Sequence, residues 1–123
     1  MEATIVVLDA DECRCHNLCQ LLREHHCLPE SFNTLEALEQ RMAENDILAV
    51  IIDIDSVPVD NRTIRNLTVQ HPTLYFFCLS ERRFHPELAN AIGSYLYACI
   101  KKPVDPDELF FWIDSIRKEG NTA

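Results

Sequence analysis

The sequence predicts an α/β domain in which helices cover both faces of a parallel sheet. Short runs of almost purely apolar residues alternate along the whole chain with segments of helical periodicity. Runs that lack a polar side indicate strands buried on both faces, as in parallel sheets. Strands that alternate with helices favour right-handed crossovers between parallel neighbours. At 123 residues the chain has the length of one domain.

Five segments are expected to be strands. The longest runs are TIVVL (residues 4–8), ILAVIIDI (47–54) and LYFFCL (74–79), and each ends at polar residues. They are rich in β-branched or aromatic side chains, which fit a pleated and buried surface. Shorter strands are expected at residues 29–32 and 97–101. The long runs therefore form the centre of the predicted sheet.

Two helices are expected in the first half of the chain. Residues 13–26 have helical spacing, and one face carries Cys15, Leu18, Cys19 and Leu22. Asn33, with Glu36 three residues later, resembles a capping box. It would open a helix whose apolar face carries Leu35, Leu38 and Met42.

Three further helices complete a βαβαβαβαβα order, at residues 62–71, 86–92 and 105–118. The last has the strongest start signal, because Asp105 can cap it, Pro106 suits its first turn and Glu108 follows three residues after the cap. No repeat, linker or low-complexity segment divides the chain. We therefore expect one domain over residues 1–119 and a disordered tail at 120–123.

Composition excludes several classes of function. The chain has 11 basic and 20 acidic side chains, a net charge of −9, which argues against direct binding to nucleic acid or an anionic membrane. Its two glycines, Gly93 and Gly120, cannot form a glycine-rich phosphate loop. No apolar run could span a bilayer and no signal peptide is visible, so a cytoplasmic location with six reduced cysteines is expected.

Chemically useful side chains follow the ends of the predicted strands. Asp9 follows the first strand, with Asp11 and Glu12 close behind, and the other ends carry Asp53 and Asp55, Ser80, and Lys102. Ligands of open parallel sheets bind outside these carboxyl ends. Two carboxylates can hold Mg²⁺, while a hydroxyl and an ammonium group can bind phosphoryl oxygens. The set suits phosphoryl transfer onto a carboxylate.

In these motifs the chain resembles the receiver domain of bacterial response regulators over nearly its whole length. The resemblance is carried by Asp9 after TIVVL, Asp53 within VIIDID, Ser80 within FFCLSE, and Lys102 with Pro103 in IKKPVDPDEL. It implies a flavodoxin-like (βα)5 fold, doubly wound, with five parallel strands in the order 2-1-3-4-5.

The resemblance also implies roles for individual residues. Asp53 would accept a phosphoryl group from a histidine kinase, and Asp9, Asp53 and the backbone carbonyl of Asp55 would bind Mg²⁺. Ser80 would bond the phosphoryl group and Lys102 would pair with it. The domain would modify itself rather than turn over a substrate, and would switch a surface for an output domain or partner protein.

Several positions depart from the usual receiver pattern, and two of them concern the site and its switch. Receivers carry two adjacent acids after the first strand, but this chain has Leu8 before Asp9. We expect weaker divalent-ion binding as a result. The position three residues before the lysine, normally aromatic, is Cys99, and the nearest aromatic residue is Tyr97.

These departures leave other functions open. A degenerate receiver could act as a protein-interaction module that needs no phosphorylation. A receiver-like domain at the N-terminus of a metabolic enzyme is another alternative, although the four site residues argue against it. A flavin-binding flavodoxin fits less well, because the acidic loop after the first strand would repel phosphate.

Two further patterns allow a structural and a functional interpretation. Phe110, Phe111 and Trp112 make the last helix apolar on more than one side, which predicts either a spare aromatic residue or a homodimer through residues 105–118. A group of thiols and imidazoles invites a zinc interpretation: Cys13, Cys15, His16, Cys19, His25, His26 and Cys27. Its spacing matches no closed zinc pattern, so core packing of the thiols is favoured.

Overall fold

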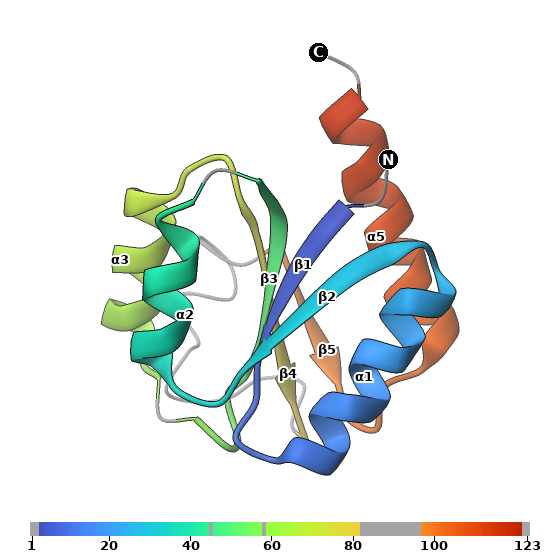
Figure 1. Ribbon diagram of the computed structural model, residues 1–123, viewed down its shortest axis with the longest axis horizontal. Helices are drawn as coiled ribbons and strands as arrows, with labels where there is room; N and C mark the ends of the chain where they lie inside the picture. Colours follow the sequence, from blue (N-terminus) through green and yellow to red (C-terminus); the bar gives the residue numbers. More distant parts are fainter. Residues whose placement is uncertain (1–2, 45, 58, 82–96, 122–123) are drawn as a thin grey trace.

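The computed structural model describes residues 3–44, 46–57, 59–81 and 97–121. These residues form a parallel five-stranded sheet of order β2-β1-β3-β4-β5, as predicted. Helices α1 and α5 cover one face of the sheet, and α2 and α3 cover the other (Figure 1). The strands all run toward the lower edge in Figure 1, so their carboxyl ends meet there.

The strands agree with their predicted positions. They are β1 (Ala3–Leu8), β2 (Cys27–Phe32), β3 (Ile47–Asp53), β4 (Tyr75–Ser80) and β5 (Ala98–Lys101). The central strands β1, β3 and β4 are buried along most of their length. This burial explains why their sequences are apolar on both faces.

In the part of the chain that the structure describes, four helices connect or follow the strands. They are α1 (Glu12–Glu24), α2 (Leu35–Met42), α3 (Asn61–Gln70) and α5 (Pro106–Asn121). Aspartates cap two of them: the Asp11 side chain accepts from the Arg14 N–H, and Asp60 accepts from the Thr63 N–H. The helix expected at residues 86–92 lies outside the described residues.

Several helix boundaries differ by one to three residues from the sequence-based expectation, and α1 ends at Glu24, two residues before the expected end. The capping box at Asn33 was wrong: the N-cap is Thr34, whose hydroxyl accepts from the Ala37 N–H at 3.2 Å. Both residues are good caps, so spacing alone could not separate them. At the other end of the chain, α5 continues past Lys118 to Asn121 and thus enters the segment expected as a tail.

Apolar side chains from alternate positions of the strands fill two cores. Ile5 and Val7 of β1 pack with α1 and α5, whereas Val6 and Leu8 pack with α2 and α3. This alternation follows from the two-residue period of a strand. Leu8 is therefore a fully buried member of the core beneath α2 and α3.

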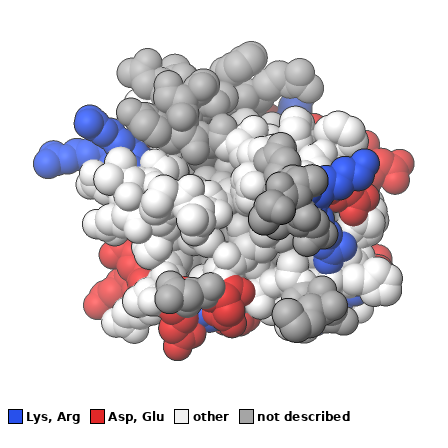
Figure 2. All heavy atoms as spheres, turned by 90° about the horizontal axis from the view of Figure 1, so that it is seen from above, with Lys and Arg blue, Asp and Glu red and all other residues white. Residues whose placement is uncertain are grey.

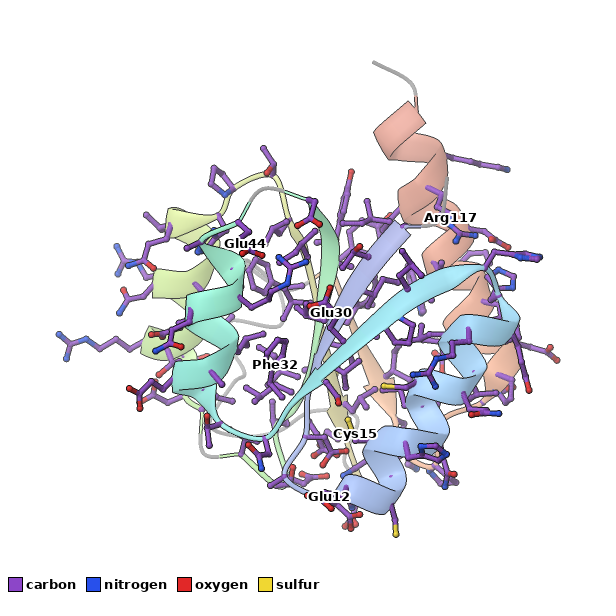
Figure 3. The ribbon with its side chains drawn as sticks, in the orientation of Figure 1. Glu12, Cys15, Glu30, Phe32, Glu44 and Arg117 are labelled. Carbon is purple, nitrogen blue, oxygen red and sulfur yellow. The ribbon has the colours of Figure 1, made fainter. Side chains whose placement is uncertain are left out.

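An arginine ties α5 to the turn between α1 and β2. Arg117 donates to the carbonyl oxygens of His25 and His26 and to the Cys27 sulfur (Figure 3). The His25 ring also stacks on Phe110 at a centroid distance of 4.1 Å. These contacts fix the end of α5 opposite the carboxyl edge of the sheet.

Charged side chains at that opposite end lie in separate groups. Figure 2 shows this end of the molecule, seen from above the view of Figure 1. Acidic and basic groups lie around its rim, with a mostly uncharged surface between them. On this face, the described atoms do not form the continuous basic surface that nucleic-acid binding uses.

A second arginine links α2 to edge strand β2. Arg41 makes two hydrogen bonds to the Glu30 carboxylate, Nε to Oε1 at 2.6 Å and Nη2 to Oε2 at 2.9 Å. It also pairs with Glu44 and Asp46, at 2.9 and 3.0 Å. Figure 3 labels Glu30 and Glu44 at the two sides of this network. The bidentate geometry makes the Arg41–Glu30 ion pair stronger than an ordinary surface ion pair.

We predict that Arg41→Met lowers the free energy of unfolding by about 1 kcal/mol at pH 7, given that Glu30 is partly exposed. Hydrogen bonding from Arg41 holds the pKa of Glu30 below its ordinary value of 4.5. Because the pKa of Glu30 is lower in the folded than in the unfolded state, the ion pair stabilises the fold at pH values above 4.5. This stabilisation is lost as the pH falls through the pKa of the folded state. Urea unfolding at pH 7 and pH 3 should show the difference shrinking in acid. Arg65→Met on α3 is the control, and a difference independent of pH would contradict the account.

Candidate functional site

Two buried carboxylates lie at the carboxyl edge of the sheet. Asp53 is the last residue of β3, and Asp9 directly follows β1, the neighbouring strand. Asp53 is 0% exposed and Asp9 is 3% exposed. Burying a carboxylate is costly unless a cation or a hydrogen-bond donor contacts it. The groups that contact Asp9 and Asp53 therefore make up the rest of the site.

Asp53 is held by one lysine and two backbone amides. Lys102 Nζ lies 2.9 Å from Oδ2 and 3.1 Å from Oδ1 of Asp53. The N–H groups of Asp55 and Ser56 donate to Oδ1 at 2.9 and 3.2 Å. The loop after β3 thus turns back over its own last residue, and the lysine reaches Asp53 from the end of β5.

Lys102 binds a second carboxylate as well. Its Nζ lies 3.0 Å from Asp55 Oδ2, and its side chain is 8% exposed. Burial lowers the pKa of Lys102, but the hydrogen bonds and charges of Asp53 and Asp55 outweigh burial and raise it above the ordinary 10.5. Lys102 is therefore a fixed positive charge, whereas Lys101 beside it is exposed, as expected.

Asp9 is held by the loop after β3 and by α1. The Ser56 hydroxyl donates to Asp9 Oδ1 at 2.9 Å and accepts from the Ala10 N–H at 3.1 Å. The Asp11 N–H donates to the same Asp9 oxygen at 2.9 Å. Arg14 Nη2 lies 3.5 Å from Asp9 Oδ1 and 3.6 Å from Asp53 Oδ2, so it spans the two carboxylates.

Ser80 lies at the same carboxyl edge of the sheet, on β4, the strand next to β3. It ends β4, is fully buried, and its carbonyl accepts from the Lys102 N–H at 2.8 Å. The Glu81 N–H donates to Asp55 Oδ2 at 2.8 Å. The structure thus brings together the residues predicted from the sequence: Asp9, Asp53, Asp55, Ser80 and Lys102.

A cavity of about 600 Å³ opens beside this cluster. Its polar wall includes Asp9, Arg14, Asn17, Asp53, Glu81 and Lys102. Its apolar lining includes Leu18, Leu21, Pro103 and Val104. Asp53 therefore borders this cavity, although its carboxylate is fully buried.

Arg14 and Ser56 were missed at the sequence level. Arg14 follows Asp9 by five residues and the cap Asp11 by three, which places it in the first turn of α1, next to the strand ends. That spacing was an available signal. Ser56 offered none, because its role depends on how the loop after β3 folds back. Glu12, considered with Asp11 as an acid of the site, is exposed at the tip of α1 (Figure 3).

The structure also shows where the two departures lie. Leu8 packs in the core beneath α2 and α3. Cys99 lies opposite Cys78 in the β4–β5 register, and a hydrogen bond between the thiols raises the pKa of Cys78. Tyr97 precedes β5, where its N–H donates to the Phe76 carbonyl at 2.7 Å, so it is far along the strand from Ser80.

Two of the three cysteines of α1 pack in the core, as favoured from the sequence, whereas Cys13 is exposed. Cys15 and Cys19 are each 5% exposed, and burial raises the pKa of Cys15 to about 12. Figure 3 shows Cys15 on the inner side of α1. Within the described residues, no three metal-binding side chains of the His, Cys, Asp and Glu types form a group. In the same residues, no helix has the length and apolarity that crossing a membrane requires.

Comparison with known proteins places the fold. No family model and no curated protein matches the sequence. Similar solved structures include a signal receiver domain of an HD domain-containing protein from Pseudomonas fluorescens (TM-score 0.81, 21% identity, 96% of this chain and 88% of that one). A two-component response regulator from Clostridium difficile has a TM-score of 0.84 at 16% identity, over 98% of this chain and all 100% of the other.

A third similar structure is the beryllofluoride-activated NtrC4 receiver domain dimer, with a TM-score of 0.82 at 19% identity over 94% of this chain and 97% of that one. The chain therefore has the fold of response regulator receiver domains, as its motifs predicted.

We predict that Lys102→Met lowers the free energy of unfolding by about 3 kcal/mol, because it leaves Asp53 and Asp55 without their closest cation. Chemical denaturation at pH 7 measures this. Lys101→Met removes the same charge from an exposed neighbour and should cost less than about 0.5 kcal/mol. Adding Asp53→Asn to Lys102→Met should recover part of the loss. Equal effects of the two lysine variants would contradict the account.

Proposed function

We propose that the chain is a phosphoacceptor receiver domain in which Asp53 takes a phosphoryl group from a histidine kinase. The observation that carries the proposal is the Asp53 carboxylate, bound by Lys102 and bordering the cavity, with Ser80 at the end of the adjacent strand. The residue roles rest on the receiver fold and on the matching positions of the motifs.

In the transfer step an Asp53 carboxylate oxygen attacks the phosphorus atom of a phosphohistidine. An O–P bond forms, the P–N bond breaks, and its electron pair returns to the imidazole nitrogen, which is then protonated. Lys102 stays near the growing charge on the phosphoryl oxygens, and the Ser80 hydroxyl donates to one of them. The domain modifies itself and has no turnover substrate.

A divalent cation fits the donor set in part. Asp9 and Asp53 supply buried carboxylate oxygens of the hard type that Mg²⁺ prefers, and the Asp55 carbonyl would be a third ligand. Bound Mg²⁺ would neutralise charge on the phosphoryl oxygens. Leu8 removes one carboxylate from the usual receiver set, so we propose a weaker metal site.

Phosphorylation would act through a partner surface on α5. Trp112 packs edge-to-face on Tyr97 at 5.7 Å, and Phe111 beside it is 61% exposed. An exposed aromatic residue continuous with a packed aromatic group is typical of an interface. We propose that this surface binds an output domain or a second copy of the chain, in the cytoplasm.

A second function is favoured by one observation. Tyr97 is far from Ser80, so the aromatic step of the usual receiver switch is missing at that place among the described residues. A degenerate receiver that binds a partner without phosphorylation would tolerate this change. The adduct experiment separates the two functions.

We predict that acetyl phosphate with Mg²⁺ forms one covalent adduct, detected by intact-protein mass spectrometry. Asp53→Asn should abolish it because the attacking oxygen is lost. Asp107→Asn, an exposed acid of α5, should leave it unchanged. Beryllofluoride binding, followed by ¹⁹F NMR, should depend on Asp53 in the same way. No adduct at millimolar Mg²⁺ would favour the interaction module instead.

We also predict that beryllofluoride promotes dimerisation, measured by sedimentation velocity. Phe111→Ser should weaken the dimer about tenfold, because it removes an exposed aromatic ring from the contact. Val69→Ser, at a 68% exposed site on α3, is the matched control and should have no effect. A chain that stays monomeric at high concentration with beryllofluoride would refute the homodimer.

A further inference from the structure

Arg14 is partly exposed to solvent and also contacts the buried carboxylates of the site. Its Nη2 lies 3.5 Å from Asp9 Oδ1 and 3.6 Å from Asp53 Oδ2, and its Nε lies 3.7 Å from Asp11 Oδ2. The side chain is 42% exposed, although both of the first two partners are buried. It therefore lies over the mouth of the site and is not part of the core.

Arg14 and Lys102 hold the carboxylates with different strength. Lys102 contacts Asp53 and Asp55 at 2.9 to 3.1 Å and is nearly buried. Charge-assisted hydrogen bonds are strongest at about 2.7–2.9 Å, so the contacts of Arg14 are long and weak. Lys102 is a fixed partner, whereas the guanidinium of Arg14 can leave at small cost.

The position of the guanidinium explains why its weak contacts matter for metal binding. Arg14 Nη2 lies 3.5 Å from Asp9 Oδ1 and 3.6 Å from Asp53 Oδ2, so it occupies the place between the two carboxylates. A divalent cation bound by both carboxylates would need that place, and its charge would repel the guanidinium.

We propose that Arg14 is a tethered competitor of the divalent cation, so that a metal ion enters between Asp9 and Asp53 only when the guanidinium leaves. The consequence for phosphorylation rests on the proposed function. Arg14, as well as the metal ligands, would then set the metal concentration that phosphorylation of Asp53 needs. The competition itself is a property of the unmodified protein.

The test uses Mn²⁺ as the probe and measures its binding to the unmodified protein by electron paramagnetic resonance. Arg14→Met keeps the side-chain length without the charge and should bind Mn²⁺ about tenfold more tightly than the wild type. Arg23→Met is the control on the same helix, nine residues and about 13.5 Å farther along. At about 0.15 M salt its effect should stay within about twofold, because charges at that distance are screened.

A second measurement follows the guanidinium directly. Adding Mg²⁺ to the wild-type protein should shift the Arg14 Nε–H signal in NMR spectra and leave that of Arg65 unchanged. If Arg14→Met is less stable, Mn²⁺ should raise its Tm more than that of the wild type. Equal or weaker Mn²⁺ binding by Arg14→Met, or an Arg14 signal that ignores Mg²⁺, would overturn the proposal. Absence of an Asp53 adduct would refute the proposed function and leave this result unaffected.

Discussion

The structure depends on the neutralisation of Asp53, a carboxylate without exposure to solvent. Removing a charge from water costs several kcal/mol, and this cost is offset only by close and well-directed partners. Lys102 supplies two contacts near 3 Å, two backbone amides of the following loop supply two more, and Arg14 lies 3.6 Å away. The ends of β3 and β5 and the loop after β3 are therefore held in one arrangement by a single side chain.

The parallel fold makes this arrangement possible. Successive parallel strands end at the same edge, so residues far apart in the sequence meet without a long loop. Asp53 and Lys102 are 49 positions apart, yet they bind directly. The same burial that stabilises the core also lowers the local dielectric, which strengthens every charge–charge interaction there. A carboxylate held in this way is a structural element that also borders a cavity.

The sequence was sufficient for the sheet and for the five residues at its edge, because buried parallel strands are apolar throughout and polar residues mark their ends. It was less informative wherever two residues could satisfy the same local rule, as at Asn33 and Thr34. It could not reveal Ser56, whose contact with Asp9 depends on a loop conformation. Arg14 was predictable, since its place in the first turn of α1 follows from the cap at Asp11.

We propose that Asp53, and no other carboxylate, receives the phosphoryl group from a nitrogen-bound donor. Phosphoramidate carries the P–N bond that a phosphohistidine also has, and borohydride reduces the resulting acyl phosphate to a stable alcohol. Peptide mass spectrometry after this reduction locates the modified residue. The account predicts conversion of Asp53 to homoserine. Conversion at Asp9 or Asp55 instead, or an unmodified chain, would contradict it.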